Sequence, residues 1–244
     1  MGVHENRDWA LAAASVLDWW QDAGVDVVVG DETFNWFAVP EVEKSPQVAS
    51  RPGPAPASPP AALPDTWEAY AAWRAGPDAP DGGWRSAAIA AEGDPAAPLM
   101  VLVDCPERDD SERLMQGRAG ALFDNMLAAI GLTRADIHLA AVCLRRPTTG
   151  RLPRDTEAAL GTLARHHVEL LAPKKLLVMG DAASRAMLAT NASPSRGRLH
   201  ALNHRNGTVT HVVTSYHPRF LLEQPAAKAD AWKDLLLLTE DQAS

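Results

Sequence analysis

The sequence is poor in several residue types, and each shortage excludes a class of protein. Its two cysteines, Cys105 and Cys143, are too few for a four-cysteine zinc or iron-sulfur site, and we expect them to be free thiols. Apolar runs such as Leu176–Met179 are far too short to cross a bilayer. The first residues lack the basic and apolar regions of a secretory signal, so we expect a cytoplasmic protein without membrane contact.

Familiar ligand-binding motifs are also missing. Neither G-x-G-x-x-G nor G-x-x-x-x-G-K-[ST] occurs, which removes the usual support for dinucleotide or nucleoside-triphosphate binding, and G-x-S-x-G is absent. His200 and His204 have the spacing of zinc ligands, but no acidic third ligand follows in register, so we expect no metal. His166 and His167 fall in a polar helical segment, where we expect surface positions.

Positive charge is scarce overall but concentrated in one segment. The chain carries 23 Lys/Arg against 31 Asp/Glu, a net charge of -8, which excludes a uniformly basic coat. Residues 143–219 nevertheless hold twelve Lys/Arg and four Asp/Glu, leaving 11 and 27 for the rest. Such asymmetry is typical of a face that binds a polyanion, although solvated helix faces would produce it too.

Composition divides the 244 residues into three regions. Residues 1–43 form an N-terminal extension, with a helix expected over 8–22 and a short strand over 25–29. Residues 44–64 hold seven of the nineteen prolines, mixed with Ala and Ser, and are expected to be a linker. The main domain is expected over residues 65–244.

In the main domain, apolar runs of strand length alternate with stretches of helical periodicity. This alternation predicts an α/β fold with an open, mostly parallel sheet and helices on both faces. The pattern predicts strands over 99–103, 137–142, 175–179 and 209–215, and helices over 67–73, 84–91, 111–130, 155–171, 182–188 and 226–238.

Chemically active side chains follow the predicted strands. Asp104, Cys143 to Arg146, Gly180-Asp181 and Tyr216 to Pro218 each come directly after a strand. Since ligands bind beyond the carboxyl ends of the strands in such sheets, we expect these segments to converge on one site.

Several segments together resemble the uracil-DNA glycosylase superfamily, in particular its iron-sulfur (family 4) type, over about residues 97–240. They are Pro106, Gly117–Phe123, Ile137–Pro153, Leu176–Ala183, Tyr216–Leu222 and Trp232–Leu235. The resemblance implies a uracil-DNA glycosylase-like fold for the main domain.

The resemblance implies two catalytic residues. Asp104, in Val103-Asp104-Cys105-Pro106-Glu107, takes the place of the acidic residue of the family's G-E-x-P-G, which positions or activates the attacking water. His217 takes the place of the histidine of H-P-[ST]-x-L-L, which lies against the base and stabilises charge as the glycosidic bond breaks. Purely structural roles are the alternatives: a helix cap or loop brace for Asp104, and a turn cap for His217.

The same resemblance implies changes around the base. Met115 stands where the family has a stacking aromatic residue, and Ala141 stands where an asparagine reads uracil. With Ser215, at the end of the last predicted strand, they are the expected substrate-binding residues. Arg145 and Leu160 fall at cluster cysteines, so we expect no iron-sulfur cluster and no other cofactor. A pocket without its reading amide should select uracil poorly.

The basic segment supplies the expected DNA contacts. In relatives, the loop after the histidine enters the minor groove, and Arg219, Phe220 and Leu221 are the candidates for that wedge here. The expected DNA-binding residues are Arg145, Arg146, Arg151, Arg196 and Arg219.

Two functions follow, and the sequence leaves both open. The first is a monofunctional DNA glycosylase without a cofactor, which excises a damaged or deaminated base by hydrolysing the N-glycosidic bond. The alternative is a catalytically reduced superfamily member that binds DNA or a repair protein, the latter through the N-terminal extension. A small-molecule nucleosidase is disfavoured, because a free nucleoside would not require twelve cationic residues in one segment.

Overall fold

A computed structural model describes residues 63–239 of the chain. These residues belong to one compact unit, residues 58–244. The helix and strand expected over 8–22 and 25–29, and nearly all of the expected linker, lie outside the described residues. Within the described part, no helix is both long and apolar enough to span a bilayer.

A six-stranded mixed sheet forms the centre of this unit, in the order β1-β3-β2-β4-β6-β5. The four inner strands are parallel, and the two edge strands pair antiparallel with their neighbours. The fold is therefore the predicted open, mostly parallel α/β sheet. The strands are β1 (Glu92–Gly93), β2 (Leu99–Val103), β3 (Ile137–Ala141), β4 (Lys175–Met179), β5 (Leu199–Asn203) and β6 (Val209–Ser215).

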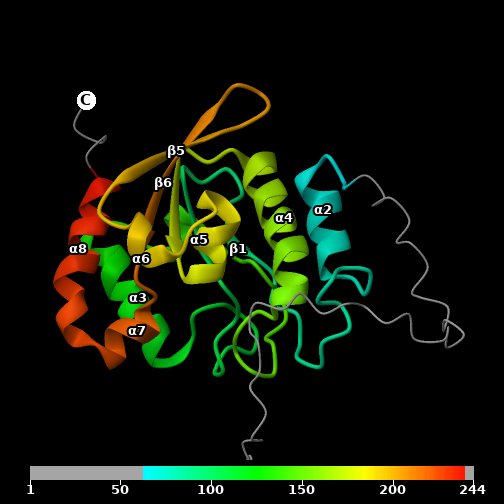
Figure 1. Ribbon diagram of the computed structural model, residues 1–244, viewed down its shortest axis with the longest axis horizontal. Coiled ribbons are helices and arrows are strands. Elements are labelled where there is room, and N and C mark those ends of the chain that lie inside the picture. Colours follow the sequence, from blue (N-terminus) through cyan, green and yellow to red (C-terminus); the bar gives the residue numbers. More distant parts are fainter. Residues whose placement is uncertain (1–62, 240–244) are drawn as a thin grey trace, which may run out of the picture. The chain divides into compact units, whose positions relative to one another are not determined.

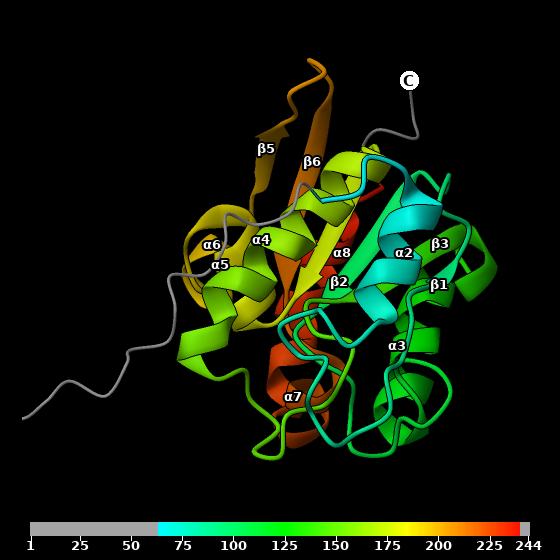
Figure 2. The ribbon, with the colours of Figure 1, turned by 90° about the vertical axis from the view of Figure 1, so that its right-hand side faces the viewer.

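Helices cover both faces of the sheet, as Figures 1 and 2 show. The face with α2, α4 and α5 is opposite the face with α3, α7 and α8. The helices are α2 (Trp67–Ala75), α3 (Gly117–Ala129), α4 (Arg154–Leu171), α5 (Asp181–Leu188), α6 (Ala192–Ser195), α7 (Pro218–Glu223) and α8 (Lys228–Leu237), with 3-10 turns at Arg134–Asp136 and Pro225–Ala227.

Burial on both faces explains the continuous apolar strands. Along β2, Val101 and Val103 pack on the side of α3 and α8, whereas Met100 and Leu102 pack on the side of α4 and α5. All five residues of β2 are buried. Because successive side chains of a strand point to opposite faces, a strand covered on both sides needs an unbroken apolar run.

One predicted helix is wrong. Residues 84–91 are not helical, because Ala88 and Ile89 pair with the segment that follows β3. The Ile89 amide donates to the Leu144 carbonyl at 2.8 Å, and Ala88 forms a bridge with Arg145. Pairing with a distant segment has overridden the local helix propensity of an alanine-rich stretch.

Another helix begins later than predicted, and some short elements were not predicted. The stretch expected to be helical from Ser111 is a loop up to Gln116, because Met115 and Gly117 have positive φ angles of 55° and 64°. Such angles interrupt a right-handed helix. The edge strand β5, whose exposure alternates, and the short helix α7 were missed.

Candidate active site

The carboxyl ends of the four parallel strands form one row. Val103 is in register with Ala141 on one side and with Met179 on the other, and Met179 is in register with Ser215. The segments that follow these residues therefore leave the sheet at the same edge, as the sequence predicted. This edge brings Asp104 and the residues around His217 into one region.

Asp104 lies at the start of α5. Its Oδ1 accepts a hydrogen bond from the Ala183 amide at 2.8 Å. Burial raises the pKa of this carboxyl, while the amides of Ala183 and Ala182 oppose the shift. The carboxylate thus braces a helix N-terminus, and it is also a group whose raised pKa suits exchange of a proton with water.

Gly180 follows β4 at this edge, as the sequence predicted, but its role there was not predicted. It precedes α5 with φ 125° and ψ 164°, a conformation that is essentially restricted to glycine. A Cβ at this position would lie 2.3 Å from Oδ1 of Asp104. The absence of a side chain is therefore what allows the carboxylate to approach the helix start.

His217 caps α7 and is largely buried, with 11% of its side chain exposed. Its Nδ1 accepts a hydrogen bond from the Arg219 amide at 3.2 Å. Burial, assisted by the charge of Arg219, lowers the pKa of His217 to about 3. The ring is therefore neutral near pH 7 and carries its proton on Nε2, because Nδ1 serves as an acceptor.

The Nε2 of His217 faces a carboxylate that the sequence did not single out. Glu107 Oε1 lies 3.5 Å from this nitrogen. The same carboxylate is bound by Arg219, whose Nη1 lies 3.0 Å from Oε1 and 2.9 Å from Oε2. Glu107, His217 and Arg219 thus form one cluster joining the loop after β2 to the start of α7.

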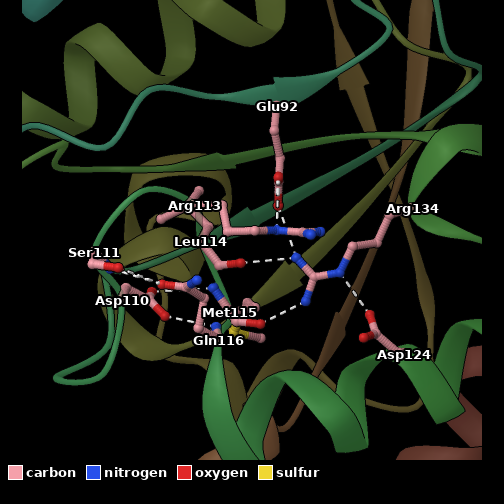
Figure 3. Close-up of polar contacts among 9 residues, drawn as sticks. All are labelled: Glu92, Asp110, Ser111, Arg113, Leu114, Met115, Gln116, Asp124 and Arg134. Carbon is pink, nitrogen blue, oxygen red and sulfur yellow. Dashed lines mark hydrogen bonds and ion pairs between the residues drawn. The ribbon is translucent and has the colours of Figure 1, made fainter.

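The loop before α3 is fixed from two sides, and Figure 3 shows both. Asp110 accepts hydrogen bonds from the amides of Glu107, Met115 and Gln116. From the other side, Arg134 donates to the carbonyls of Leu114 and Met115. Arg134 also forms ion pairs with Glu92 and Asp124.

The three residues expected around the base lie on one face of the sheet edge. Met115 and Ala141 pack into the core on the α3 side, and Met115 is only 1% exposed. Ser215 ends β6 and is fully buried, yet its hydroxyl has no hydrogen-bond partner within residues 63–239. An unsatisfied buried hydroxyl costs about 1–3 kcal/mol, so Ser215 is a natural partner for a polar ligand atom.

The five candidate DNA-binding arginines have different surroundings. Arg145 donates to the carbonyl of Ala75 at 3.1 Å, and Arg146 donates to the carbonyl of Pro106. Arg151 is exposed in the loop before α4. Arg219 is held by Glu107, as described above, although 47% of its side chain is exposed.

Arg196 is largely enclosed, with 11% of its side chain exposed. It pairs with Asp234 at 2.8 Å and lies over the ring of Tyr216, 3.5 Å from the centroid. A phosphate would have to displace Asp234 to reach it. The ring of Tyr216 has an aromatic neighbour as well, since it stacks with Phe220 at 4.8 Å.

The expected wedge divides into exposed and buried parts. Phe220 is 40% exposed, whereas Leu221 is buried in the core beside α3. Phe220 and Arg219 are therefore the two members of this loop available for contact with DNA.

The residues present do not fit an iron-sulfur cluster. Leu160 is fully buried in the core between the sheet and α4, and Arg145 binds a backbone carbonyl. Cys105 and Cys143 are both buried, and their Sγ atoms donate to the backbone carbonyls of Gly150 and Asp104. Within residues 63–239, no group of three or more His, Cys, Asp or Glu residues could hold a metal ion.

Comparison with known proteins finds similar chains that share one name. The chain is 25% identical over 164 residues to a type-4 uracil-DNA glycosylase of Pyrobaculum aerophilum, covering 63% of this chain and 83% of that protein. It is 26% identical to the proteins of the same name from Archaeoglobus fulgidus and Thermotoga maritima, over 157 and 142 residues. These alignments cover 61% and 57% of this chain, and 78% and 73% of those proteins.

The family comparison covers both expected catalytic residues. The family described as "Uracil DNA glycosylase superfamily" matches residues 90–236, which run from β1 into α8. This range includes Asp104 and His217 and exceeds half of the chain. The chain therefore belongs to the uracil DNA glycosylase superfamily, as its motifs predicted.

Proposed function

We propose that this protein is a monofunctional DNA glycosylase that removes a damaged or deaminated base by hydrolysis and needs no cofactor. The observation that carries the proposal is the placement of two buried titratable groups, Asp104 and His217, at the carboxyl edge of one parallel sheet. The unpartnered hydroxyl of Ser215 lies at the same edge. Family membership supports the same reaction class.

In this proposal each side chain has a defined task. Asp104 orients a water molecule and accepts its proton as the water oxygen bonds to C1′ of the sugar. His217 contacts the extruded base, and Ser215 supplies a hydrogen bond to it. Arg151 and the exposed part of Arg219 contact phosphates, which position the protein without reading sequence.

A panel of labelled oligonucleotides tests the proposal. Single- and double-stranded substrates containing uracil, hypoxanthine, xanthine or an alkylated base are incubated with the protein and then treated with alkali, which cleaves abasic sites. We expect cleavage of at least one substrate, with a loss of about 10²–10⁴-fold in Asp104→Asn. The matched control is Asp109→Asn, which changes an exposed aspartate of the same loop and should keep the activity.

One observation favours a second candidate function, that of a DNA-binding member without catalysis. Ala141 offers only a methyl group where the resemblance places the base-reading amide. If no substrate is cleaved while DNA binding persists, this second function replaces the first. The expected cytoplasmic location and a repair-protein partner for residues 1–43 remain predictions, since those residues lie outside the described part.

A further inference from the structure

Backbone hydrogen bonding and burial fix the position of Glu107. Its amide donates to Asp110 Oδ2 at 2.7 Å, which fixes the backbone directly after Pro106. Only 11% of its side chain is exposed. A carboxylate buried away from water needs a hydrogen-bonded counterion, and in the free protein that counterion is Arg219.

Glu107 also determines what can approach His217. The ring proton of His217 is on Nε2, and Glu107 Oε1 lies 3.5 Å from that atom. A ligand atom that approaches Nε2 on the side of Glu107 therefore lies close to a carboxylate oxygen. A carbonyl oxygen there accepts from Nε2 but meets like partial charge on Glu107, whereas an N–H group or a positive charge on that side meets the carboxylate as an acceptor.

The other site residues at this edge of the sheet do not reverse that preference. Asp104 is a second carboxylate, and Met115 and Ala141 provide no hydrogen-bond donor. Ser215 has a hydroxyl that either donates or accepts. Among the described residues, the cation that contacts Glu107 is Arg219, which is half exposed and lies where DNA phosphates can compete for it.

We propose that Glu107 is a specificity-determining residue that selects bases carrying a positive charge or an N–H donor on the edge facing its carboxylate, namely cationic N-alkylated purines. This inference rests on the proposed glycosylase function and names its substrate class. Bases that present a carbonyl at that edge, such as uracil, are disfavoured by the same carboxylate.

The chemistry of such a base fits the site. Water adds through its oxygen to C1′ of the deoxyribose, and the C1′–N9 bond breaks. The bonding electron pair passes to the purine and cancels its positive charge, while the proton lost by the water goes to Asp104. The departing purine is neutral, so no negative charge develops beside Glu107, as it would on departing uracil.

The test compares two duplexes of one sequence, one with a single 7-methylguanine and the other with a single uracil. We expect wild-type protein to excise 7-methylguanine at least about tenfold faster. Glu107→Gln, which keeps the shape and removes the charge, should shift this ratio toward uracil by about a hundredfold. Glu112→Gln is the matched control, since Glu112 is an exposed glutamate of the same loop, and it should retain the wild-type ratio.

A second variant guards against a folding defect in Glu107→Gln. Arg219→Gln leaves the carboxylate without its counterion, so its excision ratio should move further toward 7-methylguanine, in the opposite direction. Thermal melting of each variant confirms folding. Equal ratios in Glu107→Gln and Glu112→Gln overturn the inference, as does an Arg219→Gln ratio that moves toward uracil.

Failure of the inference and failure of the proposed function give different results. Equilibrium binding of both duplexes to Asp104→Asn, with and without Glu107→Gln, requires no turnover. If nothing is excised but 7-methylguanine DNA binds more tightly and Glu107→Gln removes that preference, only the proposed function fails. If 7-methylguanine or uracil is excised and Glu107→Gln changes neither the excision ratio nor the binding preference, only this inference fails.

Discussion

Replacing Gly180 with alanine perturbs the turn that allows Asp104 to reach the N-terminus of α5. The backbone at Gly180 has φ 125° and ψ 164°, a conformation that is unfavourable for any residue with a side chain. The new Cβ would lie 2.3 Å from Oδ1 and 2.5 Å from Oδ2 of Asp104. Alanine must therefore strain its own backbone and also push the carboxylate away from the Ala183 amide.

The two costs are separable. Backbone strain in this region costs about 1–3 kcal/mol. Loss of a side-chain cap at a helix start costs about 1 kcal/mol more. Gly180→Ala should therefore lower the free energy of unfolding by about 2–4 kcal/mol and Tm by roughly 4–16 °C. Displacing Asp104 by about 1 Å should also reduce any base excision by about a hundredfold.

Urea unfolding in two backgrounds tests this reasoning. In Asp104→Ala the backbone strain at position 180 remains but the collision disappears, so Gly180→Ala should cost about 1 kcal/mol less there. Gly131→Ala is the control, because Gly131 has φ 76° and no heavy atom lies within 4 Å of the Cβ that alanine would add, so it should show strain alone. Equal costs of Gly180→Ala in both backgrounds would refute the argument.

Three further predictions concern acid stability, DNA binding and iron. Burial holds the pKa of His167 well below its usual value of 6.5 and lowers that of His217 to about 3, so both rings take up protons less readily in the folded chain than in the unfolded chain. The contribution of these rings to the unfolding free energy should therefore be constant above about pH 6.5 and fall by up to about 1.4 kcal/mol per group per pH unit below it. Urea unfolding at a series of pH values should show a shallower fall in His167→Gln. An unchanged dependence of the unfolding free energy on pH in that variant would contradict this. In salt titrations of duplex binding, Arg151→Gln should reduce the slope of log affinity against log salt concentration by about 0.9. Arg196→Gln should lower Tm and leave that slope unchanged, because the guanidinium of Arg196 is paired with Asp234. Purified protein should show no absorption at about 400 nm and no stoichiometric iron, since two cysteines cannot supply the four thiolates of a cluster. Bound iron would contradict the alignment of Arg145 and Leu160 with cluster cysteines.

The parallel strands were predictable because burial on both faces demands continuous apolar runs. Strands β2, β4 and β6 have the predicted bounds, and β3 ends one residue early. Once the strands are placed, the residues that follow them must meet at one edge, which is why Asp104 and His217 could be brought together from sequence. Local pattern and global fold agree in these segments.

Prediction failed where distant contacts decide the structure. The polar surroundings of His167 indicated a surface position, but its ring is buried, lies 3.0 Å from the ring of His138 through their Nε2 atoms, and stacks on Trp67. The contact between Glu107 and Arg219 joins residues 112 positions apart. No local pattern marks such a pair, because each member by itself has the sequence signature of a solvated charge.

The contacts of Glu107 and the apolar side chain of Ala141 both affect which base the site would accept. The resemblance places a hydrogen-bonding amide at position 141, where this chain has a methyl group, and a glycine at position 107, where it has a carboxylate. The first change removes a donor, and the second adds an acceptor 3.5 Å from the Nε2 of His217. Both changes make a carbonyl-bearing base less favourable at this edge, and neither affects the position of Asp104 at the start of α5. The proposed change of base preference with retained hydrolysis would account for both substitutions, whereas loss of catalysis by itself gives no reason for a carboxylate to be buried against His217.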